Sequence, residues 1–421
     1  MALLVLLRWG VESGLLALNL GHAARAGSEV PTALRGRMPA ETARRTLAYT
    51  LARGRLGLVH LAWDASLTLA LLLSGLLPWL DAAVGRRLPG EATRFVAFLV
   101  ALSALTSLAS LPFSIWGTFV LEARFGFNRT TWRTWVADRA KGLALSAAIG
   151  VPLLYAAHGF MAATGPLWWA WLWAFLAAVQ VVLLWLYPAV IAPLFNRFVP
   201  LPEGELRSRL DALCRDTGFR TRGLFVMDAS RRSAHSNAYF VGIFRPRIVL
   251  FDTLVSAMTV GEAVAVLAHE IGHYRERHVV KRLAAGLLST LAALAVLAWL
   301  ARWPPLFRAF GFSAPSWGAA VALASLAGGA FTFLLAPVGA WWSRRHELAA
   351  DRFAVRHAGA PEALGTALVK LAGENLGNLH PHPWYVRWHY THPPLLERLA
   401  AIDAASPPGE ALPAGGVATA S

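Results

Sequence analysis

Residues 265–274 read Ala-Val-Leu-Ala-His-Glu-Ile-Gly-His-Tyr and contain the pentapeptide H-E-x-x-H. The residues before it, from Glu262, are rich in alanine, leucine and valine and contain no proline, which predicts a helix. On a helix, His269 and His273 lie on one face, one turn apart. Two imidazoles in this arrangement can bind one Zn²⁺, and Glu270 beside the first can act on a water at the metal.

A catalytic zinc site needs a third protein ligand and keeps one position open. Residues 343–351 read Ser-Arg-Arg-His-Glu-Leu-Ala-Ala-Asp and also favour a helix. Glu347 and Asp351 are four residues apart and therefore share a face. We expect Glu347 to bind the metal and Asp351 to accept a hydrogen bond from a ligand histidine. The competing ligand His346 points elsewhere, and the alternative to a metal site is a solvated helix end whose arginines neutralise both acids.

The composition of the chain is that of a membrane protein. Of its 421 residues 56% are hydrophobic and 15% are charged, and 18 are tryptophan. Six apolar stretches are each close to the roughly 20 residues that a helix needs to cross a bilayer. They are residues 56–80, 95–118, 142–164, 166–187, 284–302 and 317–341.

Residues 1–20 form a seventh, weaker candidate because Arg8 and Glu12 interrupt the apolar run. A cleaved signal peptide is the alternative. In a signal peptide the charge precedes the apolar run, whereas here it lies inside it, so a retained helix is favoured.

The distribution of arginine predicts an orientation in the membrane. The connection 21–55 carries seven Arg and two Glu, and 117–141 is also basic. By the positive-inside rule, these connections and the motif-bearing segments 188–282 and 342–421 face the cytoplasm. The net charge of +15 is then explained by topology and contact with anionic lipid. We expect no nucleic-acid partner, since no motif for one is present.

A soluble α+β stretch lies between the fifth span and the metal-binding motif. We expect an amphipathic helix over 202–217, followed by short β-strands. An exposed edge strand can hold an extended peptide by main-chain hydrogen bonds, and Asn237 and Ala238 are predicted at or near that edge. An ordinary polar turn entering a strand is the alternative. The expected strands are 223–227, 238–243 and 247–251.

These features predict an α-helical polytopic membrane protein of two parts. Residues 1–197 form an amino-terminal region of about five spans. Residues 198–405 form a small α+β, zincin-like metallopeptidase domain on the cytoplasmic side that includes two further spans. Residues 406–421 are rich in proline, glycine and alanine, and we expect this tail to be disordered.

Several longer motifs are similar to those of the CAAX prenyl protease 1 family, integral-membrane zinc metalloproteases that cleave prenylated carboxy-terminal peptides. The resemblance extends to about Asp403 and separates the chain from the shorter HtpX-type proteases, which lack the first five spans. Besides H-E-x-x-H, the motifs include Glu122-Ala-Arg-Phe-Gly-Phe-Asn128, Ile191-Ala-Pro-Leu-Phe-Asn196, Ser233-Ala-His-Ser-Asn-Ala-Tyr-Phe240, Ile248-Val-Leu-Phe-Asp-Thr-Leu254 and Thr391-His-Pro-Pro394.

The resemblance implies seven helices that form a barrel around a water-filled chamber, with one zinc ion per chain. It assigns metal binding to His269, His273 and Glu347, the general base to Glu270, and contact with substrate or oxyanion to Asn237 and His392. His392 also lies in a polar stretch outside any span. Arg398, at the start of the next expected helix, could pair with Asp351 or Glu347.

The expected function is membrane-embedded zinc endopeptidase activity on hydrophobic, membrane-proximal or prenylated CAAX-type peptides, in contact with lipid. The alternatives are an HtpX-like quality-control protease and a non-proteolytic membrane protein with a vestigial zinc site. Glu270 argues against the latter, because a purely structural site needs no base. The alanine- and arginine-rich composition favours a bacterial source and its inner membrane, which leaves the natural substrate open. The oligomeric state is also open, with a monomer as the simplest case.

Overall fold

The protein is described from a computed structural model that covers residues 1–242, 246–358 and 361–405. The tail predicted to be disordered lies outside these residues. Within them, seven helical segments are long and apolar enough to cross a membrane, as the sequence predicted. They are α1 (Ala2–Ala26), α2 (Ala40–Leu73), α4 (Glu91–Trp116) with a π-helical turn to Glu122, α5 (Trp132–Ala163), α6 (Trp168–Leu186) with short helical turns on either side (Gly165–Phe195 in all), α11 (His278–Leu300) and α13 (Trp317–His357).

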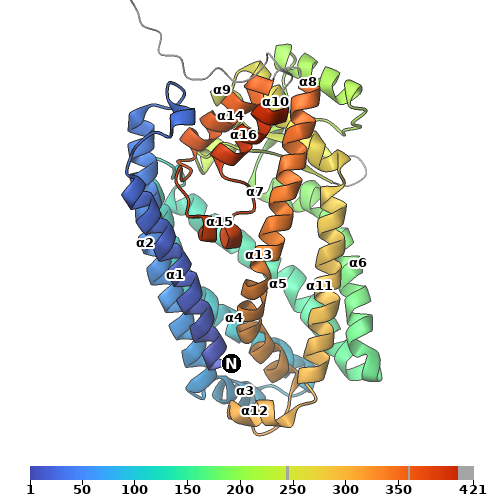
Figure 1. Ribbon diagram of the computed structural model, residues 1–421. Helices are drawn as coiled ribbons and strands as arrows, with labels where there is room; N and C mark the ends of the chain where they lie inside the picture. The colour runs from blue at the N-terminus through green and yellow to red at the C-terminus, as the bar shows by residue number, and fades with distance from the viewer. Residues whose placement is uncertain (243–245, 359–360, 406–421) are drawn as a thin grey trace, which may run out of the picture.

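The spanning helices are arranged as a ring, like the staves of a barrel (Figure 1). In the most apolar window of each span, between 0% and 39% of the residues are buried inside the protein, so most of these apolar residues are available for contact with lipid or with the inside of the ring. The short helices α3 (Leu76–Arg87) and α12 (Pro304–Ala309) close the end of the barrel opposite the catalytic domain (Figure 1).

The predicted span at 56–80 is divided between two helices. The chain turns at Ser74 and Gly75, and Gly75 has a φ of 76°, which a residue without a Cβ adopts readily. The turn separates α2 from α3. The apolar run of the sequence therefore extends past the end of the spanning helix α2 and into α3.

The first helix is part of the packed structure. α1 runs along α2, where Gly54 admits the side chain of Leu20. The buried Asn19 accepts hydrogen bonds from His382 N (2.9 Å) and Asn378 Nδ2 (3.4 Å). α1 thereby holds the loop that precedes α15 (Pro383–His389).

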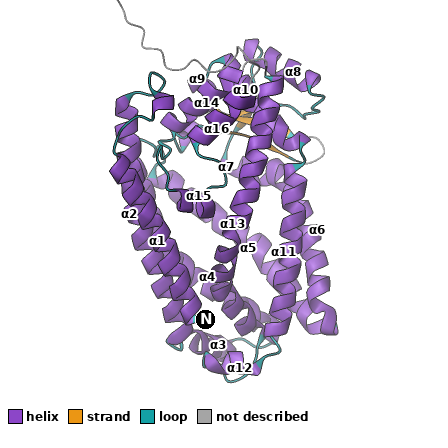
Figure 2. Ribbon diagram, viewed as in Figure 1, coloured by secondary structure: helices purple, strands orange, loops and turns teal. Residues whose placement is uncertain are grey.

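The α+β domain expected over residues 198–405 contains a four-stranded sheet (orange in Figure 2) with the order β1-β2-β4-β3. β2 pairs in parallel with β4, and β3 pairs antiparallel with β4, so β3 is an edge strand. β1, which pairs antiparallel with β2, was not predicted, because its three residues are too few to show a pattern. The strands are β1 (Phe198–Pro200), β2 (Leu224–Met227), β3 (Ala238–Val241) and β4 (Arg247–Phe251).

Helices cover the sheet and complete the domain. The amphipathic helix predicted over 202–217 is α8 (Glu205–Asp216). Leu250, Leu254, Leu267 and Ile271 are completely buried between sheet and helices, which fixes the position of α10. The remaining helices of the domain are α9 (Asp252–Ala257), α10 (Val260–Arg275), α14 (Pro361–Glu374) and α16 (Leu395–Ala405).

Candidate active site

Helix α10 carries the H-E-x-x-H motif and begins with a capping box. Thr259 N donates to Glu262 Oε2 (2.8 Å) and Glu262 N donates to Thr259 Oγ1 (3.4 Å), so two free N–H groups at the helix start are satisfied. Lys370 Nζ on α14 donates to the same Glu262 carboxylate at 2.7 Å. The start of the helix is thus anchored to a neighbouring helix.

Gly272 allows α10 to approach α13 closely. A Cβ built on Gly272 would lie 3.0 Å from the Cα of Ala350 and 3.2 Å from its carbonyl oxygen, tighter than most Cβ contacts in proteins. A larger residue would require the two helices to move apart at this crossing. The crossing places the motif histidines of α10 opposite Glu347 and Asp351 of α13.

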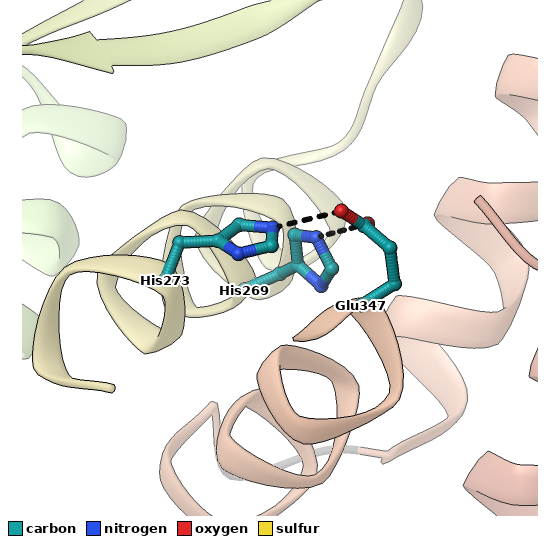
Figure 3. Close-up of side chains that lie close together, drawn as sticks. All are labelled: His269, His273 and Glu347. Atoms are coloured by element: carbon teal, nitrogen blue, oxygen red, sulfur yellow. Dashed lines mark ion pairs between the residues drawn. The ribbon is translucent and has the colours of Figure 1, made fainter. Parts of the chain in front are cut away.

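Three potential ligand atoms converge between the two helices (Figure 3). His269 Nε2 lies 3.4 Å from Glu347 Oε2, and His273 Nε2 lies 3.3 Å from Glu347 Oε1. One ligand atom from each residue lies within 4.8 Å of the others. Glu347 is 1% exposed, so the group is enclosed by protein.

The donor set fits a metal ion. Glu347 Oε2 is buried and accepts no hydrogen bond from the described residues, which is costly for a carboxylate unless a cation binds it. The separations of 3.3 and 3.4 Å exceed a normal N–H···O bond. They match the distance of about 3.3 Å between ligands that each lie about 2.0–2.1 Å from a tetrahedral ion. Burial opposes a positive charge on His269, but Asp351 and Glu347 outweigh it and raise the pKa of His269 to about 9. The site therefore favours a cation.

Asp351 and Arg398 lie behind the first histidine, as the sequence suggested. Asp351 Oδ1 accepts a hydrogen bond from His269 Nδ1 at 2.8 Å. Arg398 on α16 donates to both carboxylate oxygens of Asp351, from Nη2 at 2.6 Å and from Nε at 2.9 Å. This pair fixes the ring of His269 so that Nε2 faces Glu347.

His278 contacts the second motif histidine, His273. The sequence interpretation did not identify His278. His278 Nδ1 lies 2.9 Å from His273 Nδ1, so each motif histidine has its own partner on the ring nitrogen that faces away from Glu347. His346 stacks on His278 with ring centroids 3.8 Å apart, and Glu347, not His346, joins the donor group. The only signal for His278 was a third histidine five residues after His273, beyond the helix end at Arg275.

Glu270 occupies a position suited to a general base. It follows His269 on α10, and burial raises the pKa of Glu270, while the histidine charges oppose that rise. A carboxylate with a raised pKa can both accept and return a proton near neutral pH.

His392 reaches the same group from the loop before α16. Its Nε2 lies 3.5 Å from Glu347 Oε2, and Thr391 Oγ1 lies 3.1 Å from its Nδ1. Partial removal of water by the neighbouring groups lowers the pKa of His392, although its side chain is 64% exposed. Arg344 donates to the carbonyls of Val386 (2.9 Å) and Tyr390 (2.7 Å), so this arginine supports the preceding helix and loop.

Asn237 and Ala238 stand at the beginning of the edge strand β3. Asn237 is exposed, its Oδ1 accepts from Ala238 N (2.8 Å), and its carbonyl accepts from Phe251 N (3.0 Å). In the described part of the chain, no hydrogen bond or ion pair joins Asn237 to the three donor residues. The connection of these two residues with the donor group is therefore indirect, through strand β3, which begins at Ala238.

Comparisons with known proteins agree with this architecture. The model of the CAAX prenyl protease amino-terminal region, with five membrane helices, matches residues 19–197, and that of peptidase family M48 matches residues 200–406. The CAAX prenyl protease 1 homolog of Oryza sativa is 36% identical over 390 residues, which are 89% of this chain and 90% of that protein. CAAX prenyl protease 1 of Saccharomyces cerevisiae is 38% identical over 327 residues, covering 73% of this chain and 72% of that protein.

A solved structure has the same fold. The crystal structure of S. mikatae Ste24p superposes with a TM-score of 0.89 at 30% identity and covers 96% of this chain and 98% of that chain. Identity at this level over nearly the full length of both chains reflects common descent as well as a shared fold. The chain therefore belongs to the CAAX prenyl protease 1 family within peptidase family M48, and it is a multi-pass membrane metalloprotease.

Proposed function

We propose that the protein binds one Zn²⁺ through His269, His273 and Glu347 and hydrolyses hydrophobic or membrane-proximal peptides, including carboxy-terminal prenylated CAAX-type peptides. The observation that carries the proposal is the convergence of these three donors within 4.8 Å, with Glu270 beside them. Two imidazoles and one carboxylate are a donor set typical of catalytic zinc. Both relatives described above are named as CAAX prenyl proteases, which supports the CAAX substrate class.

Each residue at the site has a separate role in the proposed hydrolysis. When bound, the zinc ion polarises the scissile carbonyl and makes water more acidic. Glu270 takes the proton from the attacking water and passes it to the departing amine. His392 donates a hydrogen bond to the developing oxyanion, and Asp351 with Arg398 keeps His269 in its ligating orientation.

The substrate lies along the edge strand in this proposal. β3 has no strand on its outer side among the described residues, so its free N–H and C=O groups can pair with an extended peptide. Asn237 and Ala238 begin that strand and would contact the peptide near the cleaved bond. Membrane lipid is the other contact of the protein in this proposal.

A hydrolysis assay with matched peptides tests this function. Purified, zinc-loaded protein should cleave a prenylated CAAX peptide, and the matched unprenylated peptide separates recognition of the lipid from recognition of the chain end. Glu270→Gln is the inactive control. Zinc-loaded protein that cleaves neither peptide, nor any membrane-proximal peptide, would contradict the proposed function.

We also propose that the chain divides at residues 197/198, and that the active site faces the cytoplasm of a bacterial inner membrane. The two family matches end and begin at residues 197 and 200, which supports the division. The seven Arg of connection 21–55 support the orientation.

Cysteine labelling tests the orientation. In a Cys214→Ser background, Arg87→Cys on α3 and Ala309→Cys on α12 should react with an impermeant thiol reagent from outside intact cells. Gly204→Cys, next to α8 at the other end of the barrel (Figure 1), should react only after lysis. The reverse labelling pattern would overturn the orientation.

A further inference from the structure

A polar cavity of about 480 Å³ lies where the catalytic domain meets the spanning helices. Its walls come from the π-helical turn after α4, from the first turns of α5, and from the two loops 127–130 and 232–235. The loops are joined by an isolated β-bridge between Asn128 and Ser233 and by a hydrogen bond from Ala234 N to Phe127 O (3.0 Å). These contacts hold the two loops together, so the cavity has ordered walls at the junction between the domain and the spanning helices.

The acidic groups of the cavity are already paired. Arg232 donates to both oxygens of Asp138, at 2.8 and 3.0 Å. Glu122 accepts from Tyr49 Oη at 2.7 Å, and His235 Nε2 lies 3.4 Å from its other oxygen. The neighbouring Glu122 carboxylate raises the pKa of His235 although burial opposes it, so this histidine carries positive charge more readily than a free one.

Arg139 also lines the cavity, and its guanidinium belongs to neither of these pairs. Its guanidinium donates to the neutral hydroxyl of Ser114 and lies over the ring of Trp135, 5.0 Å from the centroid. In the described residues, no carboxylate lies within ion-pair distance of it. A guanidinium that stacks on an aromatic ring and faces a cavity is oriented to bind an anion such as a carboxylate.

The cavity adjoins the beginning of the edge strand. The loop 232–235 leads into β3, which starts at Ala238. A peptide paired antiparallel with β3 would direct its carboxy-terminal residues toward this end. From Asn237 back to Ser233 the chain spans four residues, at most about 13 Å, and three to four extended residues reach about 10–13 Å. The end of a segment of three to four residues beyond the cleaved bond can thus arrive at the cavity.

We propose that this cavity binds the free carboxy-terminal carboxylate of the peptide substrate, with Arg139 as its partner, about three residues beyond the cleaved bond. The proposal rests on the proposed function, since it assumes that the peptide lies along β3. Such a site would select substrates by the distance between the cleaved bond and the chain end. Side-chain identity in the released segment would then matter less than its length and its terminal charge.

Paired substrates test the role of Arg139. One peptide ends in a free carboxylate and the other in a carboxamide, with otherwise identical sequences, and both are given to the full-length, zinc-loaded enzyme. We expect kcat/KM to favour the acid by about 10- to 100-fold, because charge-assisted hydrogen bonds contribute roughly 1.5–3 kcal/mol. Arg139→Gln should reduce this ratio to about one, chiefly by raising KM for the acid. Lysine keeps the positive charge but cannot make the two parallel hydrogen bonds of a guanidinium, so Arg139→Lys should retain part of the preference for the acid.

Arg133→Gln is the matched control, because Arg133 is exposed on the same helix and does not line the cavity. It should keep the acid-to-amide ratio of the parent enzyme. Equal rates on acid and amide in the parent enzyme, or an Arg139→Gln variant that keeps the preference for the acid, would overturn the proposal.

Binding of the two peptides to Glu270→Gln, measured by calorimetry, separates this proposal from the proteolytic function. A preference for the acid that disappears in Glu270→Gln/Arg139→Gln supports the carboxylate site even if turnover cannot be followed. Equal affinity for both peptides in Glu270→Gln counts against the site and leaves the proteolytic function untouched.

Discussion

Arg398 and Asp351 form a buried, two-bonded ion pair directly behind the candidate metal site. Nη2 lies 2.6 Å from Oδ1 and Nε lies 2.9 Å from Oδ2, and the two side chains are 12% and 1% exposed. The same Oδ1 is 2.8 Å from His269 Nδ1. The chain Arg398–Asp351–His269 thus connects α16, α13 and α10 at one point.

Breaking this pair should affect both stability and metal binding. Arg398→Ala leaves the Asp351 carboxylate buried without a cation, and we expect a loss of about 3–5 kcal/mol in unfolding free energy. Asp351→Asn should weaken zinc binding by about 10- to 100-fold, because the His269 ring loses its orienting carboxylate. Thermal unfolding and competitive zinc titration measure the two effects. Zinc affinity unchanged in Asp351→Asn would remove Asp351 from the metal site.

Glu270 and Glu347 should respond differently to the same substitution. Glu270→Gln should bind zinc normally and lose hydrolysis, because the ligands remain and the base is gone. Glu347→Gln should lose zinc and activity together, because a carboxylate ligand becomes a neutral amide. Metal analysis of the purified variants, paired with a peptide assay, distinguishes the roles. Full activity of Glu347→Gln, or complete zinc loss in Glu270→Gln, would reverse the assignment.

His278 should tune zinc affinity without binding the ion. His278→Ala removes the ring nitrogen that lies 2.9 Å from His273 Nδ1, and we expect zinc affinity to fall by about tenfold or more. His278→Asn, which restores a polar atom near that position, should recover part of the loss. The control is His357→Ala, which should keep the parent affinity. In the described part of the chain, His357 bonds the carbonyl of Phe353 in its own helix turn and stacks on that ring. An unaltered zinc affinity in His278→Ala would make the contact incidental.

His392 should act in turnover rather than in metal binding. Its Nε2 is 3.5 Å from Glu347 Oε2, so its ring lies beside the three donor residues, where we propose that the oxyanion forms. His392→Ala should lower kcat by about 10- to 1,000-fold while zinc content stays normal. Steady-state kinetics on protein of known zinc content tests this. If kcat is unchanged at full zinc occupancy, another donor stabilises the oxyanion.

The contact between His235 and Glu122 should make stability depend on pH. The Glu122 carboxylate, 3.4 Å from His235 Nε2, raises the pKa of His235 in the folded protein, although burial opposes it. The stabilising contribution is therefore complete below the ordinary histidine value of 6.5 and is lost as pH rises through the raised pKa. The difference in Tm between the parent protein and His235→Gln should shrink as pH increases above 6.5. A constant difference across that range would show that the contact does not depend on charge.

Local patterns of the sequence predicted much of this architecture. The span helices follow from apolar length, and the H-E-x-x-H helix follows from its spacing, since residues four apart always share a face. The strands β2, β3 and β4 were recognisable as short β-prone runs between turns. Glu347 and Asp351 were identified in the same way, because one helix carries both.

The tertiary structure decided what depends on contacts between segments distant in sequence. His278 follows a chain reversal at Arg277, where φ is 55°, so helical periodicity no longer indicates where its ring points. Arg398 was expected beside Asp351 or Glu347, and only the packing of α16 against α13 selects Asp351. Arg139 is one of many arginines in the sequence, and it stands out only after Arg232 has paired with Asp138. Periodicity fixes which face a residue occupies, whereas the close crossing at Gly272 and the loop contacts fix which faces meet.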